Sequence, residues 1–460
     1  MASNISEPLM QCGSQDRYSP FTRSAGHFIQ SARLASRMLV YRASCYFLCH
    51  LWLFKFGFGL LRRFRPIFIF KKLVVVTRAR DVREVLQRFD DFTMGDFIDP
   101  GMPWGTFLMT VDWRQRHAQE RQLLQDAVDP TDVDKIRAIV DARCRRQIDP
   151  AGGRIDVVSQ LLEPVVVDIA KEYFGVPPLA GSTQQMAHAM RDLAGIIMVN
   201  PPVGSEPWSR SRASIAKVTD LLLQELSHKS SAAAGPPPAA LANDLLTRLV
   251  QRLQGAGAPN WFDEDWIRRY LTGLLATGGA TIVRAGAGAI DQILAHPGGL
   301  EKAQAVAIEL NQAAQSGVQQ RVDELRETLR HFVHEALRFR PMLPLLIRDT
   351  PRETVIAYGT KRARMVRAGT RVLAPPLSAM FDPEAFSDPE RFDPSRPFES
   401  YLHFGSGPRH CFGRYIAETV LLEVFRSLLV LPGLSRAAGP KGRLAFDGPV
   451  AAGLIVTFQS

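Results

Sequence analysis

A short glycine-rich segment around one cysteine limits the possible folds of this 460-residue chain more than any other sequence feature does. The segment, Phe404–Gly413, reads FGSGPRHCFG and leads into an apolar helical pattern over about 412–430. A thiol just before a helix lies near the positive end of the helix dipole, which favours the thiolate. The glycines permit tight turns and close approach to a flat ligand, and Arg409 offers charge-assisted hydrogen bonds to a carboxylate. A soft anionic ligand, a glycine-walled slot and a nearby guanidinium together suit a haem iron.

The spacing of Phe404, Gly407, Arg409, Cys411 and Gly413 resembles the haem-ligand loop of the cytochrome P450 superfamily. At average residue frequencies, such a five-position match arises by chance in roughly one chain in 10⁴. The resemblance implies a mainly α-helical fold with a small β subdomain, in which haem b lies between a long distal helix and the cysteine loop. It also implies that Cys411 is the axial thiolate, whose electron density favours O–O cleavage.

A second pattern, Glu335-Ala-Leu-Arg338, places two opposite charges three residues apart on a predicted helix. Such positions face one another, so an ion pair is geometrically natural. An exposed pair of this kind stabilises a helix by only about a few tenths of a kcal/mol. The resemblance instead implies a buried structural network that fixes the cysteine loop, with Arg391 of the PERF segment at 389–392 as its third member.

Two further motifs predict contacts to the haem propionates. His117 and Arg121 are four residues apart, which places them on one face of a helix. They resemble the family's His-x-x-x-Arg pair, and Arg348 falls where the family has another propionate-binding arginine; with Arg409 they make four predicted contacts. The alternative for His117 and Arg121 is an exposed polar helix without a ligand.

A long helical pattern runs from Asp263 to about Ala295, and its centre, GLLATGGAT, consists mainly of small residues. Consecutive Gly278 and Gly279 cost up to about 2 kcal/mol of helix propensity relative to alanine. A kink that makes room for a ligand would explain that cost. The segment resembles the oxygen-binding groove of the superfamily, in which Thr281 aligns with the threonine that steers protons to iron-bound oxygen.

The chain departs from the family immediately before this threonine. Most members carry Asp or Glu there, whereas this chain has Ala280, so another group or ordered water must take over proton supply. Arg284, one turn further on, has two interpretations. It either points into the cavity and anchors a carboxylate substrate, or it is paired elsewhere, which is the commoner case.

The N-terminal region carries nearly all of the net charge of +10, because residues 1–75 hold 11 Lys or Arg and only two acidic residues. The rest of the chain is nearly neutral, which argues against a nucleic-acid-binding domain. We predict a flexible basic segment over residues 1–42 and a single domain over 43–460. The apolar, aromatic run 43–61 is interpreted as a buried helix that opens this domain. A segment lying on a membrane surface competes with that interpretation, and a membrane span is disfavoured by Lys55.

Two short runs, 65–70 and 73–77, predict a β-hairpin turning at Lys71-Lys72, and residues 81–89 predict a helix. Helical patterns then continue to about residue 339, followed by short strands and a last helix. Five cysteines without a CxxC pair make a disulfide framework or a metal cluster improbable and fit a reducing, cytoplasmic compartment.

These observations predict a haem-thiolate monooxygenase that inserts one oxygen atom from dioxygen into a small apolar organic substrate. Electrons would come from a separate ferredoxin or flavoprotein. The alternatives are a peroxygenase or fatty-acid hydroperoxide isomerase of the same fold and, from another class, a non-catalytic haem sensor. By the same resemblance, the stretches 95–107, 200–208 and 343–346 line the substrate cavity.

Overall fold

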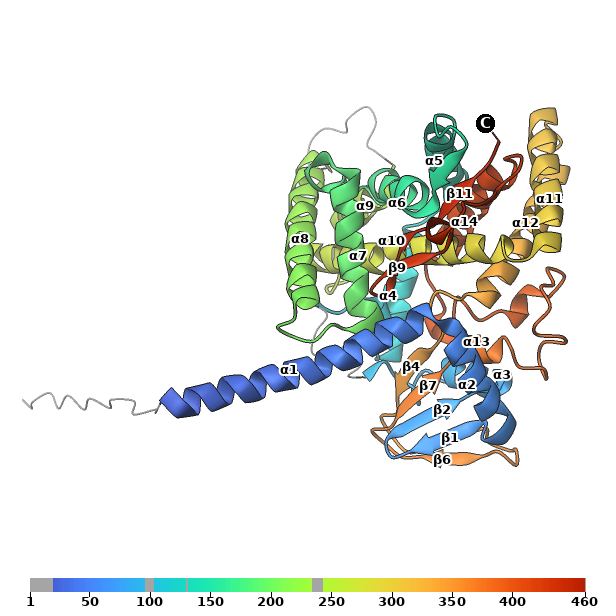
Figure 1. Ribbon diagram of the computed structural model, residues 1–460. Helices are drawn as coiled ribbons and strands as arrows, with labels where there is room; N and C mark the ends of the chain where they lie inside the picture. The colour runs from blue at the N-terminus through green and yellow to red at the C-terminus, as the bar shows by residue number, and fades with distance from the viewer. Residues whose placement is uncertain (1–19, 96–102, 130, 234–242, 460) are drawn as a thin grey trace, which may run out of the picture.

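The long helix predicted over 263–295 is α10 (Glu264–Ile293), and it crosses the centre of the molecule with other helices packed around it (Figure 1). Asp263 caps its start by accepting a hydrogen bond from the Trp266 amide at 2.7 Å. By length and composition α10 resembles a membrane span, but it is mostly buried inside the protein, as a core helix is. Helix α10 runs without interruption through Gly278 and Gly279.

The computed structural model describes residues 20–95, 103–129, 131–233 and 243–459, and most of them are helical. The other helices are α1 (Pro20–Cys49), α2 (Leu51–Phe64), α3 (Ala79–Gln87), α4 (Arg114–Asp126), α5 (Asp132–Ile148), α6 (Glu163–Asp168), α7 (Thr183–Val199), α8 (Glu206–Ala233), α9 (Leu245–Gln254), α11 (Pro297–Ser316), α12 (Gln319–Phe339), α13 (Pro376–Ala379) and α14 (Arg414–Leu429). Helices α7, α8, α12 and α14 all pack against α10.

The β structure is small and lies mostly on one side of the helical body (Figure 1). Its largest sheet has the order β1-β2-β7-β4, with β2 and β7 parallel and the other pairs antiparallel. The three smaller sheets are β5-β6, β10-β9 and β3-β11-β8. The strands are β1 (Ile67–Phe70), β2 (Leu73–Val76), β3 (Arg154–Asp156), β4 (Leu346–Asp349), β5 (Thr354–Ile356), β6 (Arg364–Val366), β7 (Arg371–Ala374), β8 (Ser435–Arg436), β9 (Ala445–Asp447), β10 (Val450–Gly453) and β11 (Ile455–Thr457).

The predicted hairpin is confirmed as β1 and β2, which pair in register from Ile67–Val76 to Phe70–Leu73. Lys71 has a φ of 51°, the left-handed backbone that a two-residue hairpin turn requires. The predicted helix that follows is α3, whose buried Val82, Val85 and Leu86 join the core under the large sheet. A second and larger core lies among the helices around α10.

The N-terminal arm differs from its prediction. A flexible segment was expected through residue 42, whereas residues 20–42 belong to helix α1, which projects from the body (Figure 1). Much of the described part of α1 is exposed, including its apolar side chains: Leu39 is 71% exposed and Val40 66%. A helix that packs so little needs no sustained apolar stripe. At His50 the chain bends by 86° into α2, so the run 43–61 is not one straight helix. Residues 1–19 lie outside the described residues.

Candidate functional site

The cysteine loop is held tightly by its own backbone and by helix α3. The Cys411 amide donates to the Phe404 carbonyl at 2.8 Å, and the His410 amide donates to the Gly407 carbonyl at 3.0 Å. Gly407 has a φ of +74°, and a β-carbon there would lie 2.7 Å from the Gln87 Cα of α3. Only glycine fits this position, so its task is loop packing.

The opposite face of the loop is open. The Cys411 side chain is exposed, and a β-carbon at Gly413 would meet no atom within 4 Å. Gly413 is also the residue that precedes α14, as the sequence pattern predicts. The loop therefore presents the Cys411 thiol to free space at the start of a helix. Gly407 is needed for close packing against α3, and Gly413 leaves space beside the thiol.

The protein surroundings alone do not favour a thiolate at Cys411. Although its tip is open to solvent, the thiol is enclosed by protein atoms on its other sides, and this desolvation raises its pKa; a hydrogen bond from the Gly413 amide and the nearby Arg121 guanidinium partly lower it. A bound metal cation would supply the missing stabilisation, because coordination deprotonates a thiol outright.

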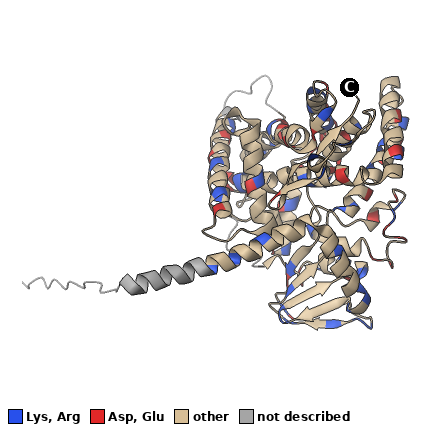
Figure 2. Ribbon diagram, viewed as in Figure 1, with Lys and Arg blue, Asp and Glu red and all other residues tan. Residues whose placement is uncertain are grey.

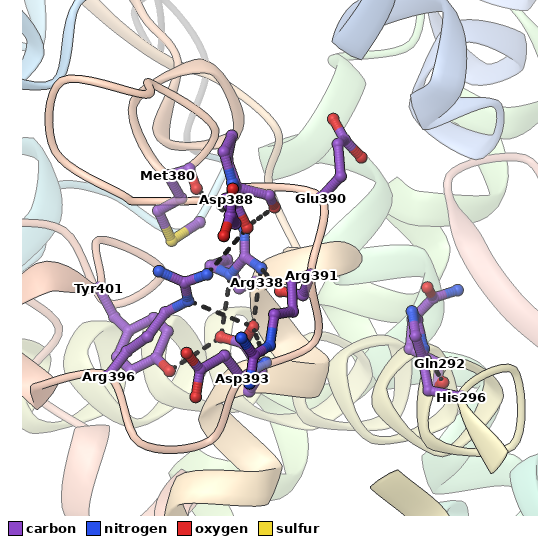
Figure 3. A network of polar contacts seen from close by, with 12 residues as sticks. Gln292, His296, Arg338, Met380, Asp388, Glu390, Arg391, Asp393, Arg396 and Tyr401 are labelled. Carbon is purple, nitrogen blue, oxygen red and sulfur yellow. Dashed lines mark hydrogen bonds and ion pairs between the residues drawn. The ribbon is translucent and has the colours of Figure 1, made fainter. Parts of the chain in front are cut away.

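Glu335 and Arg338 form a fully buried ion pair. Figure 3 shows Arg338 at the centre of the polar contacts around this pair. Arg338 donates Nη2 and Nε to the two oxygens of Glu335 at 2.7 and 2.9 Å. Its Nη1 donates to the carbonyls of Pro389 at 2.7 Å and Met380 at 3.1 Å, and Tyr401 donates its hydroxyl to Glu335 at 2.9 Å. Tyr401 lies three residues before Phe404, so the network reaches the start of the cysteine loop.

The third arginine of this network is not the predicted one. Arg391 is exposed and contributes only its carbonyl, which accepts from Arg338 Nη2 at 3.0 Å. The buried side chain of Arg396 instead lies with its Nε 3.6 Å from Glu335 Oε1 (Figure 3). The motif spacing identified the right loop but the wrong side chain, because the turn at Asp388 and Asp393 directs Arg396 inward.

The four predicted propionate contacts lie close enough together to influence one another's charge. Arg409 and Arg121 both lower the pKa of His117, and Arg409 lowers that of Arg348. Burial is the larger cause in each case, and it brings the pKa of His117 to about 4 and that of Arg348 to about 10. The structure therefore gathers one neutral imidazole and three arginines beside the cysteine loop.

The arginines of this cationic cluster (His117, Arg121, Arg348 and Arg409) differ in how the chain pairs them. Arg409 donates to Asp112 Oδ1 at 2.5 Å and to the carbonyls of Met109 and Val111. Arg348 is 6% exposed and donates only to the Ile347 carbonyl and the Met94 sulfur. Among the described residues, no carboxylate lies within 4 Å of Arg348 or Arg121. Asp112, which is bound to Arg409, raises the pKa of Arg348 without contacting it. A buried arginine with no carboxylate in contact is a place where an anionic ligand would be stabilised.

On α10, Thr281 donates its hydroxyl back to the Thr277 carbonyl and, at 3.2 Å, to the Gly278 carbonyl. A β-carbon at Gly278 would meet no atom within 4 Å, so this turn of the helix borders open space. Gly279, by contrast, is filled by Met190, whose sulfur would lie 2.6 Å from an added β-carbon. The paired glycines thus serve two needs, open space and close helix packing.

The two neighbours of Thr281 that raised questions in the sequence are both buried, one among apolar side chains and the other among backbone carbonyls. Ala280 is buried among Ala194, Met198 and Val450. Arg284 is buried too, and it donates to the carbonyls of Leu48 at 2.5 Å, Met342 at 3.0 Å and Pro449. Arg284 therefore ties α10 to the arm and the C-terminal strands, and it does not anchor a substrate. Of the stretches expected to line the substrate cavity, residues 96–102 lie outside the described residues.

The donor set fits a haem. An exposed thiol, open space beside Gly278 and Gly413, and two arginines (Arg121 and Arg348) that contact no carboxylate of the described chain match a flat ligand with an iron and two carboxylates. In the described part of the chain, no group of three or more His, Cys, Asp or Glu residues forms another candidate metal site.

Comparison with known proteins identifies the family. A cytochrome P450 family model matches residues 185–430, more than half of the chain. The chain belongs to the cytochrome P450 family. Its fold is that of solved P450 structures: CalO2 superposes with a TM-score of 0.70 at 23% identity, covering 88% of this chain and 95% of CalO2.

Sequence relatives point in two directions. Erythromycin C-12 hydroxylase of Saccharopolyspora erythraea is 27% identical over 347 residues, which cover 75% of this chain and 78% of that protein. Linoleate diol synthase of Gaeumannomyces graminis is 46% identical over 83 residues, 18% of this chain and 7% of its own length. A bifunctional dioxygenase–epoxy alcohol synthase of Pyricularia oryzae is 36% identical over 97 residues, 21% and 8% respectively. The match spans less than a tenth of these two fungal proteins.

The sequence did not reveal three contributors to the site: Asp112, Arg396 and Tyr401. Asp112 accepts from Arg409 and also from the amides of Met94 and Gly95, at 2.8 and 2.9 Å. Its position one residue before Trp113 and the helix α4 resembles any polar loop residue. Only the folded loop shows that it pairs with the cysteine loop.

Proposed function

We propose that this P450 inserts one oxygen atom from dioxygen into a small apolar organic substrate, with electrons from a separate ferredoxin or flavoprotein. The observation that carries the proposal is the exposed Cys411 thiol, held rigidly by the Phe404 carbonyl and facing open space at the start of α14. When bound there, haem b supplies the activation of dioxygen. The relatives named for erythromycin and linoleate support a polyketide-like or lipid-like substrate.

Each site residue has a distinct task in this proposal. Cys411 ligates the iron, with Phe404 and Gly413 bordering the ligand and Gly407 fixing the loop. Arg348 and Arg121 supply the counter-charges for two propionates, while Arg409 and His117 complete their hydrogen bonds. Thr281 keeps lone pairs free to accept a hydrogen bond on the distal side, because its proton is already donated to α10 carbonyls.

The first test is spectroscopic. We expect the reduced carbon monoxide complex to show the strongly red-shifted Soret band of thiolate ligation, and Cys411→Ala to abolish it. Cys45, Cys49 and Cys144 are the matched controls, since each is a free cysteine of the described chain. Their replacement by alanine should leave the band in place. A red-shifted band in Cys411→Ala would refute the ligand assignment.

A peroxygenase or hydroperoxide isomerase is the second candidate, favoured by Ala280 and by the fungal relatives named for linoleate. A hydroperoxide already contains the O–O bond, so this chemistry needs neither external electrons nor an acid at position 280. We expect measurable peroxide-supported turnover, and we expect Ala280→Asp to raise reductase-driven activity relative to it. Turnover with hydroperoxides alone, under every electron donor tried, would establish the second candidate.

We further propose that a cytoplasmic form of the protein contacts membranes through its N-terminal arm. Residues 33–76 carry no Asp or Glu, and Lys and Arg mark α1, α2 and the β1–β2 hairpin (Figure 2). The same elements expose large apolar side chains: Leu39, Val40, Trp52, Phe56, Phe64 and Phe70. Each basic residue near an anionic surface contributes about 1 kcal/mol, so several suffice for reversible attachment.

Vesicle flotation tests this contact. We expect the protein to float with anionic vesicles at low salt and to be released at high salt, because the attraction is screened. A variant with Trp52→Ser and Phe56→Ser should float less at equal charge. Attachment that resists both high salt and alkaline extraction would instead indicate an inserted arm.

A further inference from the structure

A buried ion pair lies beside the position at which α10 lacks a carboxylate. Glu163, the first residue of α6, is 8% exposed, and Arg191 of α7 donates its Nε to Glu163 Oε1. Among the described residues, no group donates to the other oxygen, Oε2. The pair and Ala280 border the same small cavity of about 10 Å³, a volume close to that of one water molecule. The rest of the lining is apolar, so the carboxylate and the guanidinium are the polar partners that a water there would have.

Arg191 separates this cavity from a hollow on the surface. A second, open hollow of about 730 Å³ lies between α1, the α7–α8 connection and the β9–β10 turn, and Arg191 and Val450 line both hollows. The Arg191 side chain therefore lies between bulk water and Glu163, and it is itself only 19% exposed. On the inner side, the cavity contacts α10 at Ala280 and Val283, on the turn that carries Thr281.

We propose that Glu163, positioned by Arg191, supplies protons to the distal side of α10 in place of the carboxylate that position 280 lacks. The proposal rests on the proposed oxygenase function. Insertion of one atom of dioxygen into a C–H bond forms a C–O–H group and one water, and it consumes two electrons from the redox partner and two protons. Those protons come from water in the open hollow; Glu163 releases each through the cavity water towards Thr281 and is then reprotonated from outside.

The electrostatics of the pair agree with this task. Burial raises the pKa of Glu163 above its ordinary value, and Asp156 raises it slightly, whereas Arg191 and His188 lower it. A carboxyl with a raised pKa exchanges protons at working pH more readily than an ordinary one. Glu163 does not reach the reacting atoms and acts through the water and Thr281, so it is a positioning and proton-supplying residue.

Glu163→Gln, with Asp168→Asn as its matched control, tests the proposal. Asp168 ends the same helix, is equally buried and pairs with Arg143, but it does not line the cavity. We expect Glu163→Gln to lower reductase-driven product formation by about 10²-fold, with the electrons appearing as hydrogen peroxide, and to leave peroxide-supported turnover unchanged. Asp168→Asn should leave this partition as it is. Glu163→Asp, which keeps the acid, should retain most of the coupling and serves if the glutamine variant folds poorly.

Rescue sharpens the test. Because Ala280 and Glu163 border one cavity, Ala280→Asp in the Glu163→Gln background should restore coupling beside Arg191. Unchanged coupling in Glu163→Gln, or an equal loss in Asp168→Asn, would overturn the proposal.

Infrared difference spectra of the resting haem-loaded protein provide a readout without turnover. A protonated carboxyl band that titrates above the ordinary range of glutamate should disappear in Glu163→Gln and persist in Asp168→Asn. Absence of that band overturns the role of Glu163 whatever the activity. Loss of the carbon monoxide band or of all wild-type turnover would instead refute the proposed function.

Discussion

Two groups of charged side chains serve the cysteine loop, and they balance their charges in opposite ways. In the network behind the loop, Glu335 accepts from Arg338, Tyr401 and the Asp393 amide, and Arg338 fills its donors with Glu335 and carbonyls. In the cationic cluster, Arg348 and Arg121 have no carboxylate partner in the described chain, and only Arg409 has one. The first group satisfies its charges within the chain, whereas the second leaves two arginines without a carboxylate in contact, as our proposal of an anionic ligand requires.

The difference separates structural charges from binding charges. A buried pair that satisfies itself stabilises one conformation of the loop and needs nothing from outside. A buried cation that lacks a counter-charge destabilises the empty protein, and the ligand that neutralises it recovers that free energy. The comparison therefore predicts that removing a charge from the first group lowers the free energy of unfolding, whereas removing an arginine from the second leaves it unchanged or raises it in the haem-free chain.

Removing the charge of Glu335 from the network behind the loop should have the largest effect on the free energy of unfolding. Glu335→Gln leaves Arg338 buried without its counter-charge, which typically lowers the free energy of unfolding by about 3–5 kcal/mol. Urea unfolding of the haem-loaded protein measures this loss. We expect Arg396→Ala to fall between this variant and the wild type, because its Nε lies 3.6 Å from Glu335 and it also donates to the Ser387 and Asp388 carbonyls.

Arg391→Ala is the control, since Arg391 is exposed and contributes only a carbonyl that alanine retains. A change of no more than about 0.5 kcal/mol is expected. A loss comparable with that of Arg396→Ala would restore the side chain that the sequence motif predicts.

This contrast also shows what the sequence could predict. The hairpin at Lys71, the bounds of α10 and the Glu335–Arg338 pair depend on local spacing, and all three appear in the structure. Arg396 and Asp112 could not be found in this way. Their partners lie 61 and 297 residues away, and neither falls at a helical spacing from the residue it pairs with. Contacts of that range depend on loop paths, which carry no periodic signal.

Local patterns could not reveal helix α1 or the surroundings of the α10 glycines, for a related reason. Helix α1 projects from the body, so it has no need of the apolar stripe by which a helix is recognised in sequence. The glycines of α10 suggested a kink, but Met190 packs onto Gly279 and open space lies beside Gly278. The two glycines do lower the helix propensity of α10, and the tertiary surroundings of each explain why they are there.

Removal of a cation from the incomplete cluster is the next test. Arg348→Met should leave the stability of the haem-free chain unchanged or raise it by about 1 kcal/mol, because an unpaired buried charge is replaced by an apolar chain. The same variant should lose haem faster than the wild type. Haem transfer to an acceptor protein and unfolding of the haem-free chain measure the two effects separately.

Arg284→Met is the matched control, because burial lowers the pKa of Arg284 to about 10, as it does for Arg348. Its donors are bound to three carbonyls, so this variant should destabilise the haem-free chain. If both variants destabilise equally, Arg348 is structural and the distinction between the two groups fails.

The last test concerns His117, whose burial beside the arginines should make the free energy of unfolding depend on pH. Its pKa lies at about 4 in the folded chain, against 6.5 ordinarily, because of burial and the neighbouring Arg409. As the pH falls, the unfolded chain therefore takes up this proton first. The stability contributed by neutral His117 is fully present above pH 6.5 and is lost as the pH approaches 4. Between pH 7 and 5.5 the haem-free wild type should lose about 1 kcal/mol more than His117→Gln does.

A propionate beside the ring favours its charged form, so haem loading should shrink this difference. Equal slopes for both chains without haem would show that His117 is not held neutral, and a difference that haem leaves unchanged would remove His117 from the propionate contacts.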